Sequence, residues 1–79
     1  MTDDRARIDA IDRALVALLA ERAACVARLW HEKAAQGVPR HDAAREAAIF
    51  AAVRDEATAS GVDPDAVEAV FRRIVGQPF

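Results

Sequence analysis

Residues 5–33 read RARIDAIDRALVALLAERAACVARLWHEK. This stretch contains no Gly or Pro and is rich in Ala and Leu, which are strong helix formers. Its apolar residues recur at intervals of three and four, the pattern of a helix that packs against other helices. This long apolar stripe consists of Ile8, Ile11, Leu15, Leu18, Cys25 and Leu29.

A cation interrupts the long apolar stripe. Arg22 occupies the position that the pattern would fill with an apolar residue between Leu18 and Cys25. Burying a cation costs several kcal/mol unless a partner pairs with it. Arg22 therefore indicates an anionic group near the middle of this helix.

The length, charge and cysteine content limit the kinds of protein that this chain can be. A chain of 79 residues is one domain near the lower limit for burying an adequate core. Eleven basic and thirteen acidic residues are interspersed and leave a net charge of -2, which argues against a nucleic-acid or membrane surface. The single cysteine, Cys25, excludes an internal disulfide and a Cys-rich metal site. We expect no metal and no cofactor.

The N-terminal residues MTDDRARID are charged, unlike those of a signal peptide, and no apolar run approaches the length of a transmembrane helix. We therefore expect a cytoplasmic protein.

Three helices are predicted within one domain, residues 1–79. The first spans about 3–35 and is followed by a loop, 36–40, that contains Gly37 and Pro39. The second spans about 42–60, with Asp42 as N-cap and Gly61 just past its end. The third spans about 64–75 and follows the helix-start signature Asp63-Pro64.

The two shorter helices carry apolar stripes of their own: Ile49, Phe50, Val53 and Ala57 on the second, and Val67, Val70, Phe71 and Ile74 on the third. The fold class is thus all-α. The first helix would be about 45–50 Å long, longer than a globule of this size is wide. We expect a second copy of the chain to cover the far half of this helix.

The charges on apolar faces suggest a binding site for an anion. Arg22 and Lys33 are eleven residues apart, so they share a face of the first helix, with Leu29 between them. Arg5 lies about 25 Å from Arg22 along the axis, so the two cannot touch one small molecule within a protomer. In an antiparallel helix pair, Arg5 of the partner subunit would approach Arg22.

The second helix adds Asp42, Arg45 and Glu46 on one side of its first turn. Arginines bind carboxylates bidentately, and Glu46 can accept a hydroxyl proton in a hydrogen bond. The set suits a small dianion that also carries a hydroxyl. It supports a rearrangement that needs neither a nucleophile nor proton transfer.

The run R5-x2-I-x2-I-D12-x2-L-x2-L-L-x-E-R22, then K33, then P39-x2-D42-x2-R45-E46, resembles the all-helical class (type II) of chorismate mutases. The resemblance covers residues 5–71 without a gap. It implies an intertwined homodimer of three-helix protomers with two shared sites. The implied reaction is the Claisen rearrangement of chorismate to prephenate in Phe and Tyr biosynthesis.

The resemblance also implies residue roles. Arg22 and Arg5 of the partner subunit would bind the two carboxylates, and Lys33 would donate to the ether oxygen. Glu46 and the backbone near Asp42 would hold the ring hydroxyl. The expected substrate-binding set is Arg5, Arg22, Leu29, Lys33, Asp42, Arg45 and Glu46, of which Arg22, Lys33 and Glu46 are the expected catalytic residues.

The chain departs from the family pattern near its C-terminus. The family carries a Gln or Glu late in a longer third helix, and that position falls beyond Phe79, with Gln77 as the nearest substitute. Loss of one donor aimed at developing charge commonly costs about 10²–10³ in rate. We therefore expect weak activity, or a site completed by a partner enzyme of the aromatic pathway.

Three alternatives stay open. The same scaffold serves isochorismate-pyruvate lyases and aminodeoxychorismate mutases, although Glu46 favours the chorismate mutase. A non-catalytic, mutase-like dimeric module for binding or regulation is the second alternative, and a plain helix-bundle interaction domain is the third. The remaining arginines, Arg54 and Arg72 among them, are expected to cover solvated faces.

Overall fold

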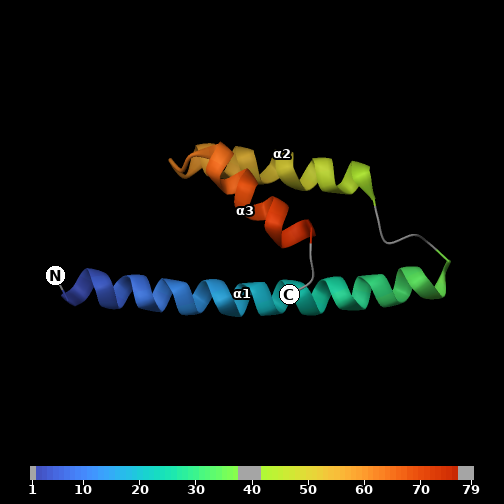
Figure 1. Cartoon of the computed structure of the whole chain (residues 1–79), viewed down its shortest axis with the longest axis horizontal. Helices are drawn as coiled ribbons and strands as arrows, with labels where there is room; N and C mark the ends of the chain where they lie inside the picture. Colours follow the sequence, from blue (N-terminus) through green and yellow to red (C-terminus); the bar gives the residue numbers. More distant parts are fainter. Residues whose placement is uncertain (1, 38–41, 77–79) are drawn as a thin grey trace. The chain divides into compact units, whose positions relative to one another are not determined.

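The computed structural model describes residues 2–37 and 42–76, and these form three helices and no strand (Figure 1). Helix α1 spans Thr2–Ala35, α2 spans Ala43–Ala59 and α3 spans Pro64–Gly76. The expected all-α fold with a long first helix is therefore confirmed. None of the helices in the described part of the chain is long and apolar enough to cross a bilayer.

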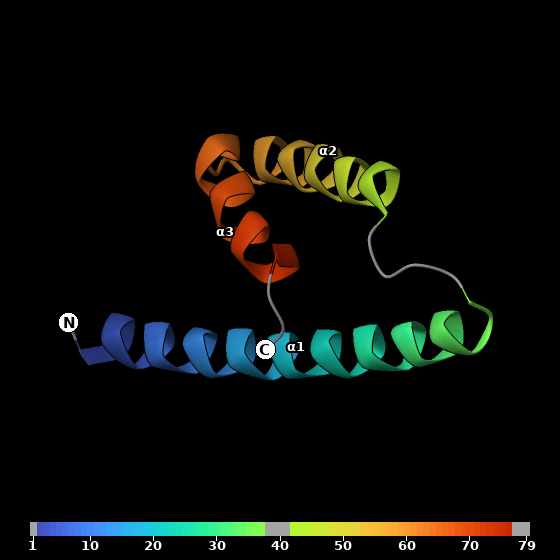
Figure 2. The same cartoon turned by 45° about the vertical axis from the view of Figure 1, so that its right-hand side comes forward.

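The chain divides into two compact units, one formed by α1 and the other by α2 with α3. The single domain expected from the sequence stays a prediction. Figure 2 shows α3 folding back against α2 within the second unit.

Helix α1 has charges that suit its ends. Asp3 and Asp4 lie in the first turn and Lys33 lies in the last, where each complements the helix dipole. The helix ends at Ala35, and Gly37 just past its end adopts a positive φ of 74° and donates its N–H to the carbonyl of Ala34. Glycine takes this left-handed conformation at little cost, so the local sequence ends the helix.

The long apolar stripe of α1 is exposed to solvent. Its large members Ile8, Ile11, Leu15, Leu18 and Leu29 each leave 47–59% of their surface exposed, and Cys25 is exposed as well. Apolar side chains in such a row gain free energy when another surface covers them. The stripe is therefore suited to packing against a further helix.

The α2–α3 hairpin is closed by two capping arrangements. At the end of α2, Gly61 has a φ of 74° and donates to the carbonyl of Thr58, while the N–H of Val62 donates to the carbonyl of Ala57. This pair of bonds is the Schellman motif. The Asp63 carboxylate then accepts from the N–H of Asp65 at 2.9 Å, which caps the start of α3.

The hairpin has a thin apolar core. Among the described residues only Ala57 is buried, with 4% of its surface exposed. The larger apolar residues facing the partner helix are half-buried: Ile49, Phe50 and Val53 on α2, and Val67, Phe71 and Ile74 on α3. Apolar packing by itself therefore holds the two helices together only weakly.

Val70, the remaining member of the apolar stripe on α3, exposes 58% of its surface. The face that α3 turns toward α2 is rotated toward Glu68, which pairs with Arg54 of α2. Val70 lies on the opposite edge of the stripe.

Candidate functional site

The expected cationic residues of the first unit lie on α1 in two different environments. Arg22 and Lys33 are half-buried, whereas Arg5 is exposed. Eleven residues of helix separate Arg22 from Lys33, so their side chains leave the same face about 16 Å apart, with Leu29 between them. Both side chains are long, so they can extend toward a small molecule that lies over Leu29 on this face.

The expected residues of the second unit lie at the start of α2. The Asp42 carboxylate accepts from the N–H of Arg45 at 3.0 Å, and the carbonyl of Asp42 accepts from the N–H of Glu46 at 3.0 Å. Asp42 is therefore the N-cap, as predicted from its type and position. Arg45 is exposed and Glu46 is half-buried.

Two carboxylates, those of Asp42 and Glu46, lie at the start of α2. Because the Asp42 side chain already satisfies a backbone N–H of α2, its carboxylate fixes the first helical turn. Glu46, one turn farther along, is a second carboxylate at the start of α2, and carboxylates accept hydrogen bonds from hydroxyl groups.

The seven expected substrate-binding residues are thus divided between the two units. Arg5, Arg22, Leu29 and Lys33 belong to the first unit, and Asp42, Arg45 and Glu46 belong to the second. Their assembly into one site stays a prediction. Gln77, the expected substitute for the late donor, lies outside the described residues.

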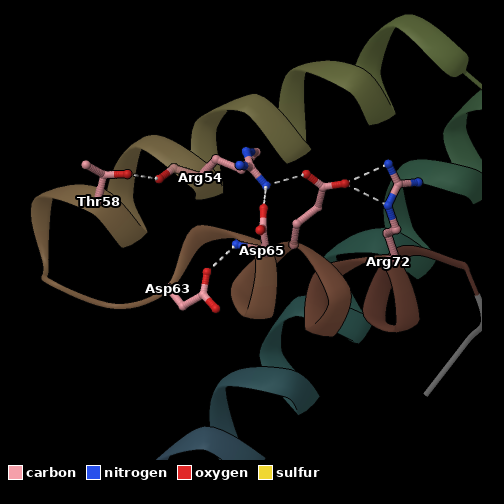
Figure 3. Close-up of polar contacts among 6 residues, drawn as sticks. Arg54, Thr58, Asp63, Asp65 and Arg72 are labelled. Atoms are coloured by element: carbon pink, nitrogen blue, oxygen red, sulfur yellow. Dashed lines mark hydrogen bonds and ion pairs between the residues drawn. The ribbon is translucent and has the colours of Figure 1, made fainter.

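The structure adds a polar network that the sequence reasoning missed (Figure 3). Arg54 donates to Asp65 at 2.9 Å and to Glu68 at 3.0 Å, and Arg72 donates to Glu68 at 2.9 Å and pairs with it at 2.8 Å. The guanidinium of Arg72 also lies 4.4 Å from the centre of the Phe50 ring, a cation–π contact.

The side chains of Arg54 and Arg72 are 39% and 62% exposed, as expected for arginines on solvated faces, but they also make contacts that the sequence did not predict. Both arginines connect α2 with α3, because Arg54 of α2 reaches Glu68 and Arg72 of α3 reaches Phe50. The spacing of Glu68 and Arg72, four residues apart, was a signal for their pairing. The pairing with Arg54 depends on how the hairpin closes and left no local signal.

The network shifts two pKa values. Hydrogen bonds from Arg72 and then from Arg54 stabilise the carboxylate of Glu68 and lower its pKa below the ordinary 4.5. Hydrogen bonds to Asp65 and then to Glu68 raise the pKa of Arg54 above its ordinary value. Both shifts favour the ionised forms of Glu68 and Arg54.

The described ranges, 2–37 and 42–76, contain no cluster of three or more His, Cys, Asp or Glu residues able to hold a metal ion. The exposed thiol of Cys25 accepts a hydrogen bond from Arg28 at 3.2 Å.

Comparison with known proteins relates the sequence of this chain to a family. The family model described as chorismate mutase type II matches residues 4–77. The chain is 40% identical to the T-protein of Enterobacter agglomerans and 34% identical to the T-protein of Haemophilus influenzae (strain ATCC 51907 / DSM 11121 / KW20 / Rd), over all 79 residues in each case. It spans about a fifth (21%) of the length of these curated relatives. No solved structure gave a significant match.

Proposed function

The chain belongs to the chorismate mutase type II family, and from that premise we propose that it catalyses the Claisen rearrangement of chorismate to prephenate in Phe and Tyr biosynthesis. The observation that carries the proposal is the family match over residues 4–77, which includes every expected site residue from Arg5 to Glu46. The charged residues on apolar faces support it independently.

The proposed catalysis relies on positioning and charge. The rearrangement is intramolecular, so the protein needs to hold the substrate in a reactive conformation and stabilise the charge that develops. Arg22 binds one carboxylate bidentately, and its half-burial reduces solvent screening of that interaction. Lys33, on the same helix face, donates to the ether oxygen as its bond breaks.

The start of α2 holds the ring hydroxyl in this proposal. Glu46 accepts the hydroxyl hydrogen bond, and Asp42 keeps the first turn of α2 in place by accepting from the N–H of Arg45. Arg45 supports this turn through its backbone N–H, which is the donor to the Asp42 carboxylate.

We propose a homodimer with two shared sites, in which Arg5 of the partner subunit binds the second carboxylate. The exposed long apolar stripe of α1 supports this assembly, because a second α1 would cover it. We also place the protein in the cytoplasm, where an exposed free thiol such as that of Cys25 stays reduced.

Chorismate turnover tests the proposal. Wild type should convert chorismate to prephenate with saturation kinetics, and Arg22→Ala and Lys33→Ala should each lower kcat/KM by about 10²-fold or more, since each removes a charged contact to the reacting molecule. Arg13→Ala, which changes an exposed arginine of the same helix, is the matched control. A well-folded wild-type dimer without turnover would refute the function.

The shared site has its own test. Arg5→Ala and Arg22→Ala proteins should each be inactive, yet a mixture refolded together should regain about a quarter of wild-type activity, because half of the randomly formed dimers contain one intact site of two. Absence of complementation would exclude the shared site.

Two further arms of the assay address the alternatives. Isochorismate and aminodeoxychorismate, assayed beside chorismate, distinguish the lyase and the other mutase. Addition of enzymes of the same pathway tests the expected partner, whose effect would be a higher rate.

A further inference from the structure

The polar network of the hairpin ends close to the proposed hydroxyl-binding group. Phe50 lies four residues after Glu46 on α2, and side chains at this spacing are neighbours on a helix surface. The guanidinium of Arg72 covers the Phe50 ring at 4.4 Å. Thus an α3 residue rests on α2 one turn from Glu46.

Glu68 fixes the position of that guanidinium. It accepts from Nε of Arg72 at 2.9 Å and pairs with the terminal nitrogen at 2.8 Å, so the planar group is held by two contacts. Its other carboxylate oxygen accepts from Arg54 of α2 at 3.0 Å, and Arg54 is also held by Asp65 (Figure 3). The network therefore links two successive turns of α2 to α3.

Apolar packing at this end of the hairpin is less complete than near the connecting turn. The buried residue Ala57 lies near the connecting turn, whereas Ile49 and Phe50 toward the start of α2 are half-buried. Charged hydrogen bonds are directional, whereas apolar contact of this extent is not. The network, whose arginines expose 39% (Arg54) and 62% (Arg72) of their side chains, therefore adds directional contacts to the apolar packing between α2 and α3.

We propose that Glu68 and Arg72 are positioning residues that order the N-terminal half of α2 and thereby place Glu46. The catalytic part of this inference rests on the proposed function. Neither residue touches the substrate in this scheme; both act through Phe50 and the α2 backbone.

Three variants test the proposal. Glu68→Gln keeps the shape but removes the charge, Arg72→Met removes the guanidinium, and Arg72→Lys keeps a charge that can pair with Glu68 but loses the flat contact on Phe50. Glu56→Gln, on the exposed surface of α2, and Arg13→Lys, on α1, are matched controls.

The first readout is turnover at a temperature where circular dichroism shows every variant fully folded. Glu68→Gln and Arg72→Met should lower kcat about tenfold, less than the roughly 10²-fold cost of a 1 Å displacement, with a smaller change in KM. Arg72→Lys should restore part of that loss, and the controls should equal wild type. A lower melting temperature with unchanged kcat in Glu68→Gln and Arg72→Met would overturn the positioning role.

The second readout does not depend on activity. Amide hydrogen exchange, measured by NMR, should show lost protection in residues 46–50 of Glu68→Gln and Arg72→Met, and no change in Glu56→Gln. If the wild-type protein were inactive, the proposed function would be refuted. The hydrogen-exchange measurement would still test whether Glu68 and Arg72 order the N-terminal half of α2. Unchanged protection in residues 46–50 would overturn the inference.

Discussion

Self-association through α1 is the most direct test of how the long apolar stripe is used. Ile11 lies on that stripe and exposes 47% of its surface, whereas Val16 lies about 140° around the helix and exposes 66%. We predict that Ile11→Glu weakens the dimer and that Val16→Glu, the same substitution five residues away, leaves it intact.

The magnitude follows from the exposure of Ile11. Fully burying an Ile side chain contributes about 1.5–3 kcal/mol, so covering its exposed half contributes about 0.7–1.4 kcal/mol per copy. A symmetric dimer contains two copies, and loss of both weakens Kd by about ten- to a hundredfold. The carboxylate of Glu adds a desolvation cost of several kcal/mol where it is left unpaired.

Sedimentation velocity over a series of concentrations measures this difference. Wild type and Val16→Glu should dissociate over the same range, and Ile11→Glu should dissociate at concentrations at least tenfold higher. Equal dissociation constants for the two variants would refute the use of this stripe. So would a wild-type protein that stays monomeric and folded at high concentration.

Three further predictions concern the described caps and the network. Asp42→Ala should lower the free energy of unfolding by about 1 kcal/mol in urea titrations, because the N–H of Arg45 loses its acceptor; an unchanged value would contradict the capping role. Gly61→Ala should destabilise the protein by about 1 kcal/mol, because Gly61 has a positive φ that alanine adopts only with strain. Gly76→Ala should not destabilise it, because Gly76 lies within α3 and has open space around it. Equal melting temperatures of the two variants would contradict this account. The lowered pKa of Glu68 means that its ionised form stabilises the fold fully above pH 4.5, and that this contribution is lost as pH falls through the lowered pKa. The stability difference between wild type and Glu68→Gln should therefore be constant near neutral pH and shrink below about pH 4.5, and a pH-independent difference in urea titrations would count against the ion pairs.

The helix boundaries were predictable because they depend on local chemistry. A carboxylate at Asp42 accepts from the next turn, and a glycine at position 61 takes a positive φ, whatever the rest of the chain does. Pro64 begins α3 for the same reason, since its fixed φ suits the first turn. Such features need only a few neighbouring residues.

The candidate site was predictable only in part. Arg22 stood out because a cation on an apolar stripe breaks a short-range pattern. Arg54 broke no pattern, and its partner Glu68 is fourteen residues away across the hairpin turn. A pairing of this kind depends on the angle at which α3 returns along α2, which the apolar spacing does not specify.

The dependence of activity on assembly follows from the length of α1. Arg5 and Arg22 are about 25 Å apart on one straight helix, so one small dianion cannot contact both from the same chain. If each site takes Arg5 from the partner subunit, activity requires the dimer. Wild-type specific activity should therefore fall on dilution below Kd, Ile11→Glu should regain activity as its concentration rises, and Val16→Glu should behave as wild type. A monomeric Ile11→Glu protein with full activity would show that one chain holds the whole site, and the shared arrangement would then be wrong.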